Sequence, residues 1–410
     1  MNIAPDYSAA YIILKTDIPD LEGHGHTFTI GRGNEICVKA IESISDVIKG
    51  KYLDDITNNW LEFYYSIVND SQLRWIGPEK GAIHLATAAL FNALWDLKAK
   101  YERKPLWQLI CNMSPDELIA IIDFKYIEDA LTKNKALEIL LKNFDTREQR
   151  IQKITNDGYP AYTTSAGWLG YSTDKLKSLC RKAKQENWKY VKFKVGSNLE
   201  EDISRLTIAR DILGDDIVFM IDANQVWGVD EAIDWVNSLK KFNPWFIEEP
   251  TSPDDILGHK KIRESVKPIM VATGEHCHNK VMFKQFFQAN AIDICQLDSC
   301  RLGSLHEILA VQLLAENFNK AICPHAGGVG LCEYVQHLAI IDYVCVSADL
   351  KGRVLEYIDH LHENFLFPCK INHGAYVIPR NYGYSATIKK EAIDSYKYPN
   401  GSFWIQNIDK

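Results

Sequence analysis

The sequence lacks three features that would place the protein in well-defined classes. None of its ten cysteines forms a Cys-x-x-Cys pair, and they are scattered over 410 residues, so we expect free thiols in a reducing compartment. No apolar run reaches the length of about 18 residues that a membrane-spanning helix needs, so the sequence predicts no membrane partner. The net charge is −8 and no block of basic residues occurs, so we expect no nucleic-acid partner.

The first six residues also lack the features of a targeting segment. They contain neither the hydrophobic stretch of a signal peptide nor the Arg-rich character of a transit peptide, which indicates an intracellular protein. With 46% hydrophobic residues, a chain of this length can bury large cores. We therefore expect one large domain with a smaller one beside it.

Three carboxylates end successive apolar runs at a regular interval. Asp222, Glu248 and Glu275 are separated by 26 and 27 residues, and each precedes a helical pattern. Because one strand and its helix take about 25–30 residues in a (β/α) barrel, we expect these side chains at the carboxyl ends of successive parallel strands. Three oxygen donors placed there predict a Mg²⁺ site. Solvent-exposed or helix-capping carboxylates are the alternative interpretation.

The same interval continues on both sides of these acids. Upstream, Lys192 and Lys194 lie two positions apart in a strand-like segment, so alternation places both ammonium groups on one face. Downstream, Asp298, His325 and Glu356 end further apolar runs at intervals of 23, 27 and 31 residues from Glu275 onward. The pattern predicts one polar side chain or more at each of several neighbouring strand ends.

This set of residues resembles the enolase superfamily, in its mandelate racemase subgroup. Three longer segments are similar to the L-fuconate dehydratases, which include an animal mitochondrial branch: YTTSAGWLGY at 162–171, EPTSPDDILGH at 249–259 and CPHAGGVGLC at 323–332. The resemblance extends from about residue 6 to the end of the chain. It implies an α/β fold, a (β/α)7β TIM-type barrel with an α+β capping domain. We expect the cap at 1–155, the barrel at 156–364, and at 365–410 a tail that returns to the cap.

The N-terminal region shows the pattern expected of such a cap. β-like runs at 11–15 and 27–30 predict a small sheet, and apolar residues at helical spacing predict a long helix at 82–101. Between the two runs, Gly-His-Gly-His at 23–26 is typical of a flexible turn rather than of a metal site. Members of the family carry further residues before Pro5, so we expect the first strand and a mobile loop of the cap to be missing.

The chemistry implied is removal of a proton next to a carboxylate, which requires stabilisation of the charge that forms. Lys194 is the expected base, because the Lys192 ammonium and a bound Mg²⁺ would lower its pKa. Asp298 would fix the tautomer of His325, and His325 would protonate a leaving β-hydroxyl. The expected result is loss of water from an acid sugar to give a 2-keto-3-deoxy acid.

The remaining candidate residues are expected to bind the substrate or support the site. We expect Lys192, Asn224 and Glu356 to bind the substrate, with Asn224 close to the metal. The resemblance implies that Glu356 hydrogen-bonds the substrate carboxylate, although it could instead cap a strand. Glu249 points away from Glu248 by alternation, which favours a structural ion pair. The sequence Glu-His-Cys-His at 275–278 suggests zinc, but consecutive strand residues point in opposing directions and cannot all reach one ion.

Three functions stay open from the sequence. The first is a Mg²⁺-dependent L-fuconate dehydratase, and the second is another acid-sugar dehydratase or epimerase of the same subgroup. The third is a catalytically silent regulatory or binding protein on this scaffold, against which the intact set of site residues argues. The resemblance indicates the mitochondrion, with the cytoplasm as the alternative, and leaves a homo-oligomer open.

Overall fold

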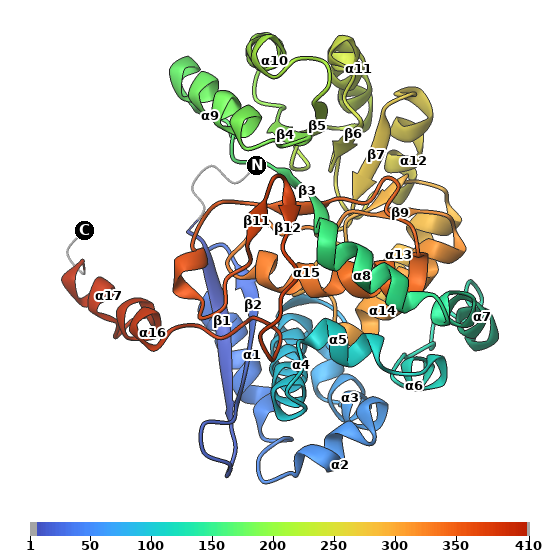
Figure 1. The fold of residues 1–410 in the computed structure, drawn as a ribbon, viewed down its shortest axis with the longest axis vertical. Helices are drawn as coiled ribbons and strands as arrows, with labels where there is room; N and C mark the ends of the chain where they lie inside the picture. Colours follow the sequence, from blue (N-terminus) through green and yellow to red (C-terminus); the bar gives the residue numbers. More distant parts are fainter. Residues whose placement is uncertain (1–5, 408–410) are drawn as a thin grey trace.

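Eight parallel strands form the barrel of the computed structural model, which describes residues 6–407 (Figure 1). Their order is β10-β3-β4-β5-β6-β7-β8-β9. The strands are β3 (Tyr159–Thr163), β4 (Tyr190–Lys194), β5 (Val218–Asp222), β6 (Phe246–Glu248), β7 (Met270–Thr273), β8 (Ile294–Cys295), β9 (Ala321–Ile322) and β10 (Leu355–Tyr357). Residues 1–5 of the predicted cap and 408–410 of the predicted tail lie outside the described residues.

A helix follows each of the first seven barrel strands, and the chain then closes the series with β10. These helices are α9 (Thr173–Gln185), α10 (Leu199–Leu213), α11 (Val229–Leu239), α12 (Ile256–Ser265), α13 (Lys280–Gln288), α14 (Leu305–Asn317) and α15 (Leu331–Ile341), the last of which continues into η3 (Asp342–Ser347). The predicted (β/α)7β architecture is therefore confirmed. The domain limits at 155 and 364 stay a prediction.

The barrel interior explains why its strands end in polar residues. A compact cluster of buried side chains fills it: Tyr162, Met220, Phe246, Ala272, Ile294, Cys323 and Val354. Met220 and Phe246 precede Asp222 and Glu248 by two positions, so the carboxylates lie on the same face of their strands. The apolar cluster thus fills the barrel directly below the polar residues at the strand ends.

The predicted strand ends are accurate for three of the polar residues, lie beyond the observed ends for Glu275, Asp298 and His325, and fall one residue short for Glu356 in β10. Lys194, Asp222 and Glu248 are the last residues of β4, β5 and β6. Glu275 lies two residues beyond β7, while Asp298 and His325 lie beyond β8 and β9 and pair with each other as an isolated parallel bridge. Short regular strands leave these later side chains on loops above the barrel.

The cap combines a hairpin with a layer of helices. Strand β1 (Ser8–Lys15) pairs antiparallel with β2 (Glu22–Thr29). The helices that follow are α1 (Asn34–Ser45), α2 (Leu53–Thr57), α3 (Trp60–Val68), η1 (Leu73–Trp75), α4 (Gly81–Tyr101), α5 (Leu106–Cys111), α6 (Pro115–Ala120), α7 (Lys133–Phe144) and α8 (Arg147–Asp157). Figure 1 shows the hairpin and α1–α6 together on the side away from α9–α11.

The segment 23–26 is part of β2, so its interpretation as a flexible turn is wrong. The reason is the close approach of the long buried helix α4 to the hairpin. A Cβ atom added at Gly25 would lie 2.3 Å from the carbonyl oxygen of Ala89 and 2.4 Å from the amide nitrogen of Ala93. Glycine is therefore needed here for packing of a strand against a helix, and not for a turn.

The C-terminal tail contacts both the barrel and the cap. Its short hairpin, β11 (Ile371–Asn372) and β12 (Ala375–Tyr376), adds to the first residues of β3, which β10 leaves unpaired. Further on, the Tyr11 hydroxyl of β1 donates to the carbonyl of Ala386 at 2.5 Å. The tail ends in α16 (Lys390–Tyr396) and α17 (Ser402–Gln406), at the left edge of Figure 1.

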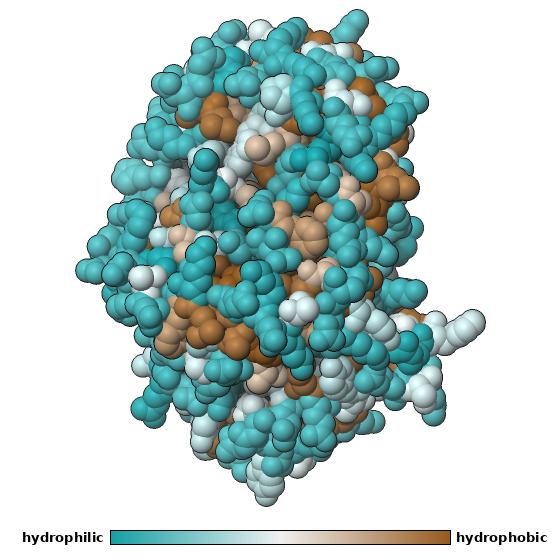
Figure 2. Space-filling view, turned by 90° about the vertical axis from the view of Figure 1, so that its right-hand side faces the viewer, coloured by the Kyte–Doolittle hydropathy of each residue, from teal (hydrophilic) through white to brown (hydrophobic). Residues whose placement is uncertain are grey.

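The surface and the helices agree with a sequence that has no long apolar run. Figure 2 shows a face that is mostly hydrophilic, with hydrophobic residues in separate groups. In residues 6–407, none of the helices combines the length and apolar character that a bilayer crossing needs. The ten cysteines are free, as the sequence predicts, and the structure shows that they are also buried.

Candidate active site

Lys192 is the centre of the buried charges at the strand ends. Its Nζ lies 2.7 Å from both carboxylate oxygens of Glu248, 2.9 Å from Oε1 of Glu356 and 3.3 Å from Oδ2 of Asp222. Burial alone would lower the pKa of Lys192, but Glu248 and Glu356 outweigh it and hold the pKa well above its usual value. Lys192 is therefore a fixed positive charge that contacts three carboxylates from three different strands.

Lys194 reaches the rim of the same cluster, where 15% of its side chain is exposed. Its Nζ lies 2.5 Å from Oδ2 of Asp222. Burial and the Lys192 ammonium lower the pKa of Lys194, but the carboxylates of Asp222, Glu248 and Glu275 together outweigh them, so the pKa lies above its usual value. The Asp222 carboxylate is thus a direct partner that stabilises the Lys194 ammonium, and the lowered pKa expected with bound Mg²⁺ stays a prediction.

Burial and repulsion between neighbouring carboxylates at the three predicted metal ligands raise the pKa of Glu248 and of Glu275. Burial raises the pKa of Glu248, and the carboxylates of Asp222, Glu356 and Glu275 raise it further. Burial and Glu249 likewise raise the pKa of Glu275. An all-oxygen donor set in which carboxylates repel one another suits a hard divalent cation, so these residues fit Mg²⁺.

His325 and Asp298 form the expected pair. His325 Nδ1 lies 2.7 Å from Oδ2 of Asp298, while Oδ1 of Asp298 accepts the amides of Cys300 and Arg301. Burial opposes a charge on His325, but Glu275 and Asp298 raise its pKa to about 10. The Asp298 carboxylate, held by amides on its other oxygen, therefore orients the ring and stabilises its protonated form.

The second ring nitrogen of His325 has partners for both protonation states. Nε2 lies 3.5 Å from a carboxylate oxygen of Glu275, which favours a proton there. It also accepts the amide of Gly327 at 3.1 Å, which requires the unprotonated nitrogen. The surrounding carboxylates outweigh this single contact and favour the charged ring. Nε2 is thus the atom that can lose a proton while Nδ1 stays bonded to Asp298.

Glu356 and Asn224 complete the set of predicted residues. Oε2 of Glu356 accepts the amide of Ala326 at 2.7 Å, and its other oxygen contacts Lys192, so it joins the ends of two strands. The backbone amide of Asn224 donates to Oδ1 of Asp222 at 2.9 Å. Both residues line one cavity of about 410 Å³ with Lys194, Asp298 and His325. Lys192, Asp222 and Glu248 are buried beneath it.

A neighbouring network explains Glu249. Its Oε1 lies 2.9 Å from Nδ1 of His276 and accepts from Nε2 of Gln225 at 2.9 Å. Glu249, Glu275 and His276 each offer one ligand atom within 4.8 Å of the others, so a second metal-capable group shares Glu275 with the site. Within residues 6–407, Cys277 is no part of such a group.

The sequence did not reveal the cap side of the cavity. Tyr7 and Phe28 of the hairpin region line it, and their rings lie 5.9 Å apart. Arg301 also lines it and donates from Nε to the carbonyl of Glu275. Arg301 follows Asp298 by three residues, so a search for cations just beyond the predicted strand ends would have found it. Tyr7 and Phe28 lie far from the predicted strand ends in the sequence, so no local pattern indicates that they line the cavity.

Comparisons with known proteins agree with the architecture. The family described as "Mandelate racemase / muconate lactonizing enzyme, N-terminal domain" matches residues 3–111, and "Enolase C-terminal domain-like" matches residues 175–392. L-galactonate dehydratase of Hypocrea jecorina is 54% identical over 404 residues, which cover 97% of this chain and 89% of that protein.

Two solved structures show the same fold. The crystal structure of human Mitochondrial enolase superfamily member 1 has a TM-score of 0.97 and 51% identity, and the match covers 99% of this chain and 93% of that one. L-talarate/galactarate dehydratase from Salmonella typhimurium LT2, liganded with Mg and L-lyxarohydroxamate, has a TM-score of 0.71 and 23% identity over 94% of this chain and 90% of that one. The cap, the (β/α)7β barrel and both family matches establish that the chain belongs to the enolase superfamily, among the proteins with mandelate racemase/muconate lactonizing enzyme-type domains.

Proposed function

We propose that the protein is a Mg²⁺-dependent dehydratase of acid sugars and that L-fuconate is its substrate. The observation that carries this proposal is the cavity lined by both an amine, Lys194, and a protonated imidazole, His325, above a cluster of buried carboxylates. An amine and an imidazolium in one cavity can remove one proton and deliver another, which elimination of water requires.

In this proposal Asp222, Glu248 and Glu275 hold the metal. When bound, Mg²⁺ supplies positive charge that offsets these carboxylates and the charge that develops on the substrate carboxylate. Asp222 and Glu248 are buried, and both Asp222 and Glu275 raise the pKa of Glu248, which supports this assignment, as does the Salmonella typhimurium relative with bound Mg. Lys192 and Glu356 would then orient the substrate carboxylate, and Asn224 would line its binding cavity.

Lys194 is the proposed base. Once the charge of Asp222 is offset, the principal contribution that raises the pKa of Lys194 is gone. Burial and the Lys192 ammonium then both lower that pKa, which frees the neutral amine that must take the C2 proton. In this proposal Lys194 stays protonated and paired with Asp222 until Asp222 binds the metal.

His325 is the proposed acid. Its Nε2 would deliver the proton to the leaving C3 hydroxyl, and the bond between C3 and that oxygen breaks as water departs. Asp298 would keep the ring oriented through Nδ1. The enol that remains at C2 and C3 takes up a proton at C3, loses the proton of its C2 hydroxyl to solvent and becomes the 2-keto-3-deoxy acid.

A screen of acid sugars tests this function. We expect a 2-keto-3-deoxy product from L-fuconate in the presence of Mg²⁺ and none after addition of excess EDTA, measured by carbonyl derivatisation and mass spectrometry. L-galactonate is the second candidate, because the Hypocrea jecorina relative carries that name, and it differs from L-fuconate by a hydroxyl at C6. A preference for L-galactonate would show that L-galactonate, and not L-fuconate, is the substrate. If none of the acid sugars gives a product, the result would favour a catalytically silent protein.

His325→Asn is expected to separate the two proton transfers. Dehydration should fall by about 10²–10⁴-fold, the usual contribution of a positioned acid or base. Exchange of the C2 proton should continue, because Lys194 is untouched. The measurement is deuterium incorporation at C2 of recovered substrate in D₂O. His373→Asn, at an exposed histidine of the tail, is the matched control. Normal dehydration by His325→Asn would remove this residue from the mechanism.

The location of the protein is part of the proposal. We propose an intracellular, mitochondrial protein that acts on small acid sugars, and the name of the human relative supports the mitochondrial assignment. The division into a cap at 1–155, a barrel at 156–364 and a tail at 365–410 is proposed with it.

A further inference from the structure

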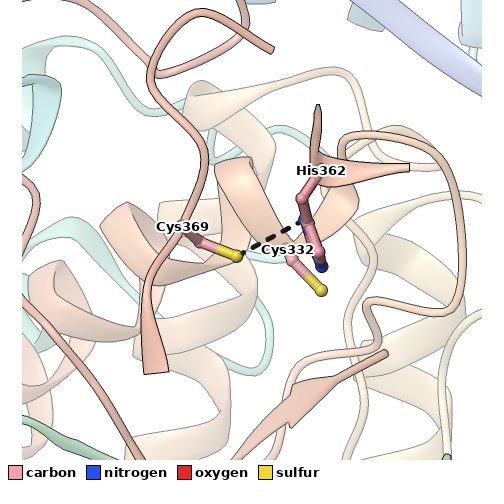
Figure 3. A group of neighbouring side chains, drawn as sticks. All are labelled: Cys332, His362 and Cys369. Carbon is pink, nitrogen blue, oxygen red and sulfur yellow. Dashed lines mark hydrogen bonds between the residues drawn. The ribbon is translucent and has the colours of Figure 1, made fainter. Parts of the chain in front are cut away.

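A further group of side chains that could hold a metal ion lies apart from the residues that line the cavity. Figure 3 shows Cys332, His362 and Cys369 with their polar ends together. They come from three segments: the first turn of α15, the turn η4 (His362–Asn364) and the tail before β11. Each offers one ligand atom within 4.8 Å of the others, and Sγ of Cys369 lies 3.7 Å from Nδ1 of His362.

These distances fit a tetrahedral ion. Zinc binds sulfur at about 2.3 Å and imidazole nitrogen at about 2.0–2.1 Å, which places two such ligands about 3.6 Å apart at a tetrahedral angle. The observed separation of 3.7 Å between Cys369 and His362 therefore leaves room for the ion without rearrangement of either side chain. Two thiols and an imidazole also form the borderline-soft donor set that selects zinc over magnesium.

The orientation of His362 fits a metal ligand. Its Nε2 lies 2.7 Å from the carbonyl oxygen of Ile358, so a proton on Nε2 is fixed by the backbone. Nδ1 then faces the two cysteines and can offer its lone pair to an ion. Metal-binding histidines commonly donate their other ring nitrogen to a carbonyl or carboxylate in this way.

Glu333 supplies an independent observation. Its side chain is fully buried, and its Oε1 lies 2.8 Å from Nδ1 of His362. Within the described residues, its Oε2 is buried with no hydrogen-bond partner. A buried carboxylate oxygen without a partner is costly, and a cation beside it would provide one. An ion that replaces the proton between His362 and Glu333 would satisfy both groups.

We propose that Cys332, His362 and Cys369 bind one Zn²⁺ ion, and that the Glu333 carboxylate, which contacts His362, shifts toward the ion as the fourth donor. The two thiols and the imidazolium release their protons to solvent as the ion binds, and no electron is transferred. With all four positions taken by the protein, the site is a structural one. It is separate from the carboxylates that are proposed to hold Mg²⁺.

The position of the site gives the ion a role. Sγ of Cys332 lies 3.7 Å from the carbonyl oxygen of Ala326, which follows His325, and 3.9 Å from that of Glu356. Cys369 belongs to the tail. The ion would therefore fasten the tail to the two strand ends that carry His325 and Glu356.

Cobalt substitution in the full chain tests the proposal. Fully reduced protein is stripped of metal and titrated with Co²⁺ in excess Mg²⁺, and near-ultraviolet charge-transfer bands report cobalt bound to thiolate. Cobalt at the active-site carboxylates gives no such band. We expect one thiolate-bound Co²⁺ per chain, displaced by Zn²⁺. No band in the wild-type protein would overturn the proposal.

Variants locate the site. Cys369→Ser should remove the band and weaken zinc binding by more than the about 10–100-fold that loss of an outer partner costs. Cys180→Ser, at another buried thiol on α9, is the matched control and should keep the band. Glu333→Gln should weaken zinc binding but keep the thiolate band. His362→Asn, at a partly exposed position, carries the same test if Cys369→Ser does not fold. Unchanged zinc affinity in both Cys369→Ser and His362→Asn would overturn the assignment.

Discussion

Lys194→Ala should lose dehydration and C2 proton exchange together. A positioned general base contributes about 10²–10⁴-fold, and the loss should reach at least the upper end here because the proton is weakly acidic. Lys192 cannot replace the missing amine, since it is buried and its Nζ is held by Glu248 and Glu356. The measurements are turnover and deuterium incorporation at C2 in D₂O.

The control for this variant is Lys182→Ala on α9, where 54% of the lysine side chain is exposed. It should keep full activity. Mg²⁺ binding, measured by calorimetry, should survive in Lys194→Ala and even strengthen, because Asp222 loses the ammonium that competes for its carboxylate. C2 exchange at the wild-type rate in Lys194→Ala would show that another group is the base.

The second large effect is expected from the metal ligands. Asp222→Asn, Glu248→Gln and Glu275→Gln should each weaken Mg²⁺ binding and reduce turnover by more than about 10³-fold, the upper end of what loss of one charge-stabilising group costs. Each replacement keeps the shape of the side chain, so the fold should persist by circular dichroism. Glu264→Gln on the surface helix α12 is the matched control.

Chelation gives the same result without a mutation. Exhaustive treatment with EDTA should abolish turnover, and added Mg²⁺ should restore it. Calorimetry with Mg²⁺ alone separates lost binding from lost chemistry in the three variants. Full activity after chelation, or unchanged Mg²⁺ affinity in all three variants, would contradict the assignment of the ligands.

The spacing of the sequence predicts the barrel because each strand and helix is a local unit. Lys194, Asp222 and Glu248 end their strands where the apolar runs end, and the interval between them reflects one repeated structural unit. The position of Glu275 beyond β7 could not be predicted so well, since short strands pass into loops whose length the apolar pattern does not fix.

The spacing of apolar and polar residues along the sequence does not predict contacts between distant segments. The bond between Tyr11 and Ala386 joins residues 375 positions apart, and Phe28 reaches the cavity only because the cap packs over the barrel. The direct contact between Lys194 and Asp222 was missed for a related reason. The sequence places Lys192 near Lys194 by alternation, but it does not reveal that Asp222 lies 2.5 Å away.

The ion pairs of Lys192 have a consequence for how the protein is made in the cell. Carboxylates gathered in a protein interior usually require a counterion before the chain can fold around them. Here Lys192, covalently part of the chain, already neutralises part of that charge. We therefore expect newly synthesised chains to fold while magnesium is scarce and to bind it later. The supply of magnesium would then determine the fraction of molecules that is active, and not the fraction that folds.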